Sequence, residues 1–340
     1  MKVLAKTKLA AFLEGMRADH KVVAPLRQGA EVQFGELDSD QLAAGYSGRT
    51  RYSAKECVFP ESEVLLTFGM PPAGEVSIAE HPYETPTVLW GIRPCDVAGI
   101  QVLDAVFQSA PADAYYQARR DNTLLLALNC NEVGKTCFCA SLDTGPTARG
   151  GFDLVFTDLG EEFLVEVGSG AGEALLDEQP DLFVEATESQ REKARDLRER
   201  AEATFSTLFD VETVRAGLAD SYDEPVWEEQ AAKCTLCGTC CVVCPACHCF
   251  NVEDIRKSRK VVERVRYWDA CQFSGFTRMA TSNSRPTQGE RWRQKIYDKF
   301  VYMPARYEGT LGCTGCGRCL ELCQGSINIV DVLTKVTSGH

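Results

Sequence analysis

The sequence predicts an α+β protein in three parts: an N-terminal α/β-type domain over residues 1–170, a helical connector over 171–223 and a cysteine-rich domain over 224–340. Short apolar segments alternate with helical periodicity in the first half. Residues 180–220 are polar and carry charges of both signs at helical spacing. Most of the 17 cysteines lie beyond residue 224, and two groups of them share one spacing.

In the N-terminal domain, strands are expected where short segments are rich in Val, Leu and Phe. These segments are 20–25, 64–68, 87–92, 123–128, 152–157 and 163–167. Helices are expected at 7–17, 96–107 and from 172 onward. The loop at 168–172 is rich in glycine but lacks the third glycine of a dinucleotide-binding loop, so we interpret it as a strand-to-helix turn.

The connector is interpreted as a solvated helix, because its acidic and basic side chains lie three and four residues apart. The segment 222–227, which contains Pro225, marks the expected start of the next domain.

The charge distribution argues against nucleic acid as a partner. The net charge is -13, and residues 224–340 carry 16 Lys and Arg against 12 Asp and Glu, which is only mildly basic. We find no run of 18 apolar residues and no signal peptide, so a cytoplasmic protein without membrane contact is expected. In that reducing compartment, grouped cysteines are metal ligands or redox centres rather than disulfides.

The first cysteine group has the C-x₂-C-x₂-C-x₃-C-P spacing of bacterial-type ferredoxins, and the second repeats it except that Gln324 replaces the proline. In such runs the fourth cysteine binds the other cluster. The sequence therefore predicts two [4Fe-4S] clusters in an α-helical-ferredoxin-like dicluster domain. The expected ligands are Cys234, Cys237, Cys240 and Cys323 for cluster 1, and Cys244, Cys313, Cys316 and Cys319 for cluster 2.

The long interval between the two groups is expected to be helical at 252–262, 268–280 and 288–300. Basic residues at 256–266 either raise the cluster potentials, dock an acidic partner or form a solvated face. Four further cysteines in this half are expected to pack around the clusters rather than bind metal. They are Cys241, Cys247, Cys249 and Cys271.

A third cysteine group lies in the N-terminal domain at the ends of expected strands. It consists of Cys95, Cys130, Cys137 and Cys139. Because strand ends can meet at one edge of a sheet, these four thiols are candidate ligands of a third iron-sulfur cluster, with redox-inert packing as the alternative. Cys57 has no companions and is expected to be structural.

Several segments together carry a family resemblance. These are Gly91–Asp96, Cys130 with 136–139, 144–146, 151–153, the two ferredoxin-type runs and Trp268–Cys271. With them, the chain resembles, over most of its length, the iron-sulfur subunit that is shared by sulfhydrogenases, as their beta subunit, and anaerobic sulfite reductases.

The resemblance implies an electron-transfer subunit of a multi-subunit cytoplasmic oxidoreductase in anaerobic metabolism. The implied neighbours are a ferredoxin-reductase-like subunit that carries FAD and binds NAD(P), and a catalytic subunit of hydrogenase, sulfite reductase or heterodisulfide-reductase type.

No acid–base or nucleophile motif is found in this chain, so no catalytic residue is expected. Two alternatives remain open at this point. One is a self-contained flavin-dependent iron-sulfur oxidoreductase, and the other is a zinc-bound assembly module.

Overall fold

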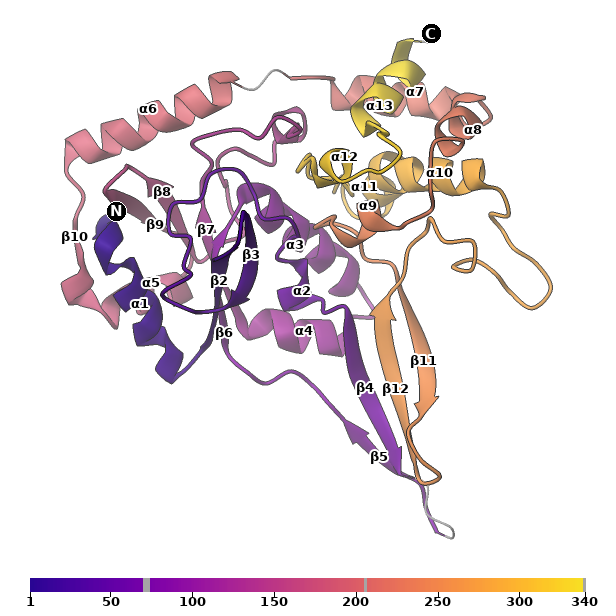
Figure 1. The fold of residues 1–340 in the computed structure, drawn as a ribbon, viewed down its shortest axis with the longest axis horizontal. Coiled ribbons are helices and arrows are strands. Elements are labelled where there is room, and N and C mark those ends of the chain that lie inside the picture. Colours follow the sequence, from indigo (N-terminus) through magenta and orange to yellow (C-terminus); the bar gives the residue numbers. More distant parts are fainter. Residues whose placement is uncertain (70–73, 205–206, 339–340) are drawn as a thin grey trace.

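The structure is a computed structural model that describes residues 1–69, 74–204 and 207–338. Helices and strands are mixed throughout, which confirms the α+β prediction. Two sheets and a helical region make up the molecule (Figure 1).

The first sheet has eight strands in the order β10-β1-β9-β8-β7-β6-β2-β3. The pairs β2–β6, β6–β7 and β7–β8 are parallel, and the other neighbours are antiparallel. The bounds are β1 (Lys2–Ala5), β2 (Lys21–Gln28), β3 (Glu31–Glu36), β6 (Thr87–Ile92), β7 (Thr123–Leu128), β8 (Leu154–Asp158), β9 (Glu162–Val167) and β10 (Phe183–Glu185). The strands predicted in these segments are confirmed, whereas β1, β3 and β10 were not foreseen.

Burial on both faces explains why β6 reads as a continuous apolar run. Trp90 packs in a core with Phe12 of α1 (Leu9–Gly15), while Leu89 packs in a second core with Leu103 of α3 (Pro94–Phe107). Successive side chains of β6 therefore point to opposite faces of the sheet. The carboxyl end of β6 leads directly into α3, where Cys95 lies.

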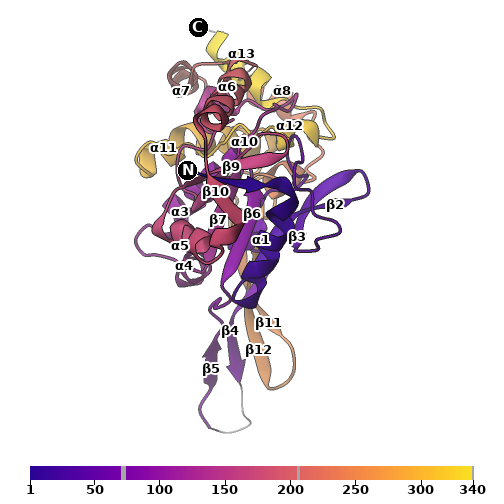
Figure 2. The ribbon, with the colours of Figure 1, turned by 90° about the vertical axis from the view of Figure 1, so that its left-hand side faces the viewer.

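The second sheet has the order β11-β12-β4-β5 and projects from the body of the molecule as an arm (Figures 1 and 2). Its strands are β4 (Ser62–Gly69), β5 (Ser77–Glu80), β11 (Phe250–Arg256) and β12 (Val261–Trp268). The helix predicted over 252–262 is therefore wrong. The valines and the isoleucine in this segment match a helical spacing, but β-branched residues also favour a pleated surface, and the cross-strand pair Asp254–Arg264 fixes the register.

Strand β12 pairs with β4, so a strand from between the cysteine groups completes a sheet begun in the N-terminal half. Arg266 of β12 is 2% exposed and hydrogen-bonds to Glu63 and Asp113. Strand β10 similarly lies within the predicted connector but pairs with β1. The domain boundaries at 170 and 223 stay predictions. Strand β10 pairs with β1 across the first boundary, and β12 pairs with β4 across both.

The helical region covers the rest of the cysteine-rich part. It contains α6 (Glu188–Thr204), α7 (Val211–Asp220), α8 (Val226–Ala231), α10 (Gln288–Tyr297) and α13 (Ile329–Ser338). Helix α10 continues through a π-helical turn, Asp298–Tyr302, which confirms the helix predicted at 288–300, whereas 268–280 contains no helix. Trp227, Trp292 and Leu333 form its core together with Phe138 from the N-terminal half.

Short helices complete the fold: α2 (Lys55–Val58), α4 (Ala114–Asp121), α5 (Gly170–Asp177), α9 (Thr239–Val242), α11 (Met303–Arg306) and α12 (Arg318–Glu321). Within the described residues, we find no helix with the length and apolar character needed to cross a membrane.

Candidate metal centres

The two cysteine runs fold into loops of matching conformation. Leu236 and Gly315, which occupy equivalent positions, have φ values of 57° and 60°, and Gly238 and Gly317 both have a φ of 72°. Each loop then enters a single helical turn, α9 or α12. The repeated spacing in the sequence thus produces a repeated backbone shape.

The cysteines predicted to bind cluster 1 line one pocket. Cys234, Cys237 and Cys240 come from the first loop, and Cys323 comes from the end of the second. Trp292 and Lys295 of α10 also line this pocket. The exchange of the fourth cysteine between runs, expected from the ferredoxin spacing, is therefore compatible with the fold.

The cysteines predicted to bind cluster 2 are also neighbours. Cys244, Cys313 and Cys316 are buried, and the Cys319 thiol interacts electrostatically with all three. Burial raises the pKa of the Cys313 thiol to about 11, while the Lys299 ammonium acts in the opposite direction. Nζ of Lys299 lies 3.5 Å from Sγ of Cys244 and donates to the Gly312 carbonyl at 2.7 Å.

The four N-terminal cysteines converge as the strand-end argument predicts. Cys95 at the start of α3, Cys130 after β7, and Cys137 and Cys139 in the following loop line one pocket. The guanidinium of Arg49 donates to Sγ of Cys137 at 3.1 Å. The Nε atoms of Arg49 and Arg93 are buried without a hydrogen-bond partner.

The N-terminal cysteine group is in contact with a cysteine predicted to bind cluster 2. Cys95, Cys139 and Cys316 form one buried cluster of side chains. A Cβ on Gly315 would lie 2.5 Å from Cα of Cys139, so only glycine lets the two backbones approach this closely. The amide of Phe138 donates to the Gly315 carbonyl at 2.8 Å across this contact.

Buried lysines next to these thiols are a feature of the sites that could not be predicted from the sequence. Lys55, Lys295 and Lys299 are 2%, 4% and 5% exposed, and none forms an ion pair with a carboxylate within the part of the chain that the structure describes. Burial works against the charge of Lys295, but the thiolates of Cys240, Cys241 and Cys319 hold its pKa well above the usual range. Burial opposes the charge of Lys299 in the same way, and the thiolates beside it raise its pKa.

An uncompensated buried ammonium is strongly destabilising, so these sites fit an anionic occupant. Thiolate-ligated iron-sulfur clusters are anions, and the donor set of four thiols suits them. The four-thiol sets that line these pockets, together with the buried lysines, therefore fit iron-sulfur clusters.

The basic segment that drew attention in the sequence lies elsewhere, on the β11–β12 hairpin. Arg264 pairs with Asp254, Arg266 pairs with Glu63, and Lys257 lies 3.5 Å from Glu263. The cations that face the thiols come instead from α2 and α10 and from the turn that follows α10.

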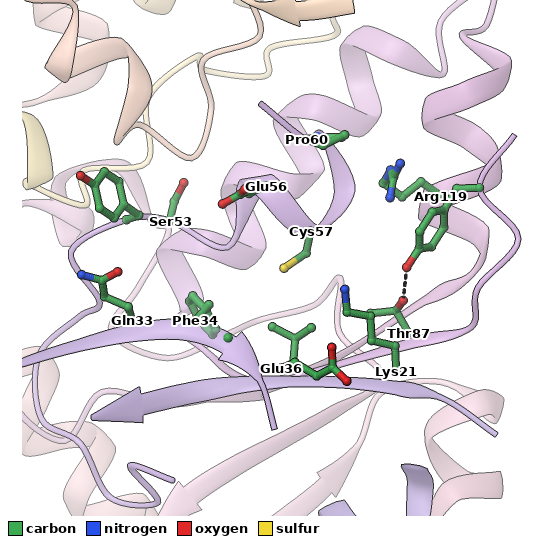
Figure 3. Close-up of a pocket in the computed structure, with 14 residues that line it drawn as sticks. Lys21, Gln33, Phe34, Glu36, Ser53, Glu56, Cys57, Pro60, Thr87 and Arg119 are labelled. Atoms are coloured by element: carbon green, nitrogen blue, oxygen red, sulfur yellow. Dashed lines mark hydrogen bonds between the residues drawn. The ribbon is translucent and has the colours of Figure 1, made fainter. Parts of the chain in front are cut away.

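Cys57 lies apart from these groups, in a pocket of about 380 Å³ (Figure 3). Lys21, Glu36, Glu56 and Arg119 also line this pocket. Burial raises the pKa of the Cys57 thiol to about 12, so the group stays protonated and weakly nucleophilic at neutral pH.

Comparison with known proteins agrees with this picture. Residues 233–327 match the model of the 4Fe-4S dicluster domain family. The whole chain is similar to subunit beta of sulfhydrogenase 2 from Pyrococcus furiosus, with 32% identity over 334 residues that cover 96% of each chain. The dicluster match contains all eight cysteines of the two repeated runs, and the longer match also includes the N-terminal cysteines.

Proposed function

Because the chain belongs to the family of sulfhydrogenase beta subunits and is an iron-sulfur electron-transfer subunit, we propose that it relays electrons between two partner subunits in the cytoplasm. One partner is a ferredoxin-reductase-like subunit that binds FAD and NAD(P). The other is a catalytic subunit of hydrogenase, sulfite reductase or heterodisulfide-reductase type. The active site of the terminal reaction lies outside this chain.

The proposed ligands of the two dicluster-domain clusters are the predicted sets: Cys234, Cys237, Cys240 and Cys323, and Cys244, Cys313, Cys316 and Cys319. Bound [4Fe-4S] clusters supply reversible one-electron storage. Lys295 and Lys299 offset the negative charge of the two sites, which favours the reduced state.

A third cluster on Cys95, Cys130, Cys137 and Cys139 is part of the proposal. The observation that carries it is the convergence of four thiols from separate segments beside Arg49, whose guanidinium contacts one of them. Two observations support a link between the proposed sites: Cys95 and Cys139 pack against Cys316, a proposed ligand of cluster 2, and Cys319, another, lines the pocket proposed for cluster 1. The three sites therefore form a connected series, as electron relay requires.

The test is to purify the chain anaerobically and measure iron, acid-labile sulfide, zinc and flavin, with absorption spectra before and after dithionite. We expect iron and sulfide in equal amounts, a brown absorption band that dithionite bleaches, and no flavin. Zinc without sulfide would refute the proposal. A flavin that co-purifies with the isolated chain would favour the self-contained oxidoreductase instead.

A further inference from the structure

Four cysteines of the C-terminal half remain outside the sites above. Cys241 lies in α9, Cys247 and Cys249 follow the first run, and Cys271 lies after β12. From the sequence they were expected to pack around the clusters rather than bind metal. In the structure, however, they form one group.

Side-chain interactions link the thiols of this group. The Cys241 side chain interacts most strongly with that of Cys240 and also with those of Cys247 and Cys271, and the Cys271 side chain interacts with that of Cys249. The backbone amide of Asp269 donates to the Cys249 carbonyl at 3.0 Å, which ties the segment before Cys271 to the segment of Cys249. Three segments that are separate in the sequence thus bring four thiols together.

A buried cation from the N-terminal half faces this group. Nζ of Lys55 donates to the carbonyls of Cys247 at 3.2 Å and Cys241 at 3.5 Å, and lies 3.8 Å from the centre of the Trp268 ring. Nζ of Lys299 lies 3.7 Å from Sγ of Cys247. Burial lowers the pKa of Lys55, and the neighbouring thiolates, Cys247 first, oppose that effect. An anion at this position would compensate the buried charge.

We propose that Cys241, Cys247, Cys249 and Cys271 bind a further [4Fe-4S] cluster. Four thiols are the ligand number of a cubane, and they bind as thiolates after releasing their protons. A single tetrahedral zinc ion is the competing occupant of four cysteines.

This additional centre lies between the two ferredoxin-type sites. Cys241 directly follows Cys240 of cluster 1, and Cys247 lies beside Cys244 of cluster 2, with Lys299 in contact with both sulfurs of that second pair. The proposal rests on the proposed function in that it adds a centre to the same relay. It depends on different ligands and is tested separately.

The experiment compares the anaerobically purified wild-type chain with Cys271→Ser and Cys249→Ser, using iron and zinc analysis and electron paramagnetic resonance after reduction. We expect each variant to lose about four irons per chain, since each cubane holds about four. The matched control is Cys57→Ser, which removes a half-buried thiol outside all four groups and is expected to keep the wild-type iron content.

Wild-type iron content in both serine variants, or loss of zinc in place of iron, would overturn the proposal and leave the other centres intact. If both variants precipitate, Cys130→Ser decides, because it lacks a proposed ligand of the N-terminal cluster. About twelve irons remaining in Cys130→Ser support the additional cubane, and about eight or fewer overturn it. A wild-type chain without iron and sulfide would refute the proposed function as well, so the two failures are distinguishable.

Discussion

Replacing Lys299 by Met should lower the reduction potential of cluster 2. The ammonium is buried, lies 3.5 Å from Sγ of Cys244, and interacts electrostatically with Cys313. A bound cluster would carry the added electron mainly beyond the sulfur. Over a separation of about 7 Å, an effective dielectric constant of about 20 would give an attraction of about 2.4 kcal/mol. That energy corresponds to about 100 mV for one electron. Loss of the cation therefore destabilises the reduced state by about this amount.

The assay is a redox titration of the anaerobic protein, followed by electron paramagnetic resonance at each potential. Lys299→Arg keeps the charge and should stay near the wild-type potential. Lys335→Met removes a lysine whose side chain is 55% exposed and should change the potential little, because water screens it. This prediction is wrong if Lys299→Met retains its full iron content and all its midpoint reduction potentials lie within the range of the Lys335→Met control. The buried Lys299 would then not set the cluster potentials.

Further outcomes follow from other parts of the molecule. Cys130→Ser should remove about four irons and leave the dicluster spectrum in place, whereas unchanged iron would return the N-terminal thiols to a packing role. Asp96→Asn should destabilise the protein by about 3–5 kcal/mol in denaturant titration, because it leaves Arg318 buried and unpaired. A cost below about 1 kcal/mol would show that the Asp96–Arg318 pair is not needed. Cys57, with its pKa raised to about 12, should resist iodoacetamide at pH 8 and become reactive only at strongly alkaline pH; rapid labelling at pH 8 would contradict the raised pKa.

Local patterns predicted much of the fold. The strands β6 and β7 and the helix α3 lie where apolar segments and helical periodicity indicated, because their neighbours along the chain are also their neighbours in the core. The two cysteine runs were recognisable because their ligand spacing is fixed by the size of a cluster.

What the sequence could not show depends on contacts between distant segments. The segment 252–262 was predicted to be helical, but it forms most of β11 and the start of β12, which pair with each other, and β12 also pairs with β4. The grouping of Cys241 with Cys271 depends on the loop after β12. The burial of Lys55 likewise depends on its contact with Trp268, far away in the sequence.

The pairing of β12 with β4 also constrains how the chain is made. Arg266 and Glu63 are 203 positions apart, so β4 leaves the ribosome long before its partner strand is synthesised. During that interval one edge of β4 is unprotected and can pair with the wrong strand, which is a known cause of aggregation. The second sheet can be completed only after the first cysteine run has also left the ribosome. Until then, the thiols of that run either carry no cluster or have already received one from the assembly machinery. Production of this protein in a foreign host is therefore expected to depend on the rate of cluster delivery relative to the rate of translation.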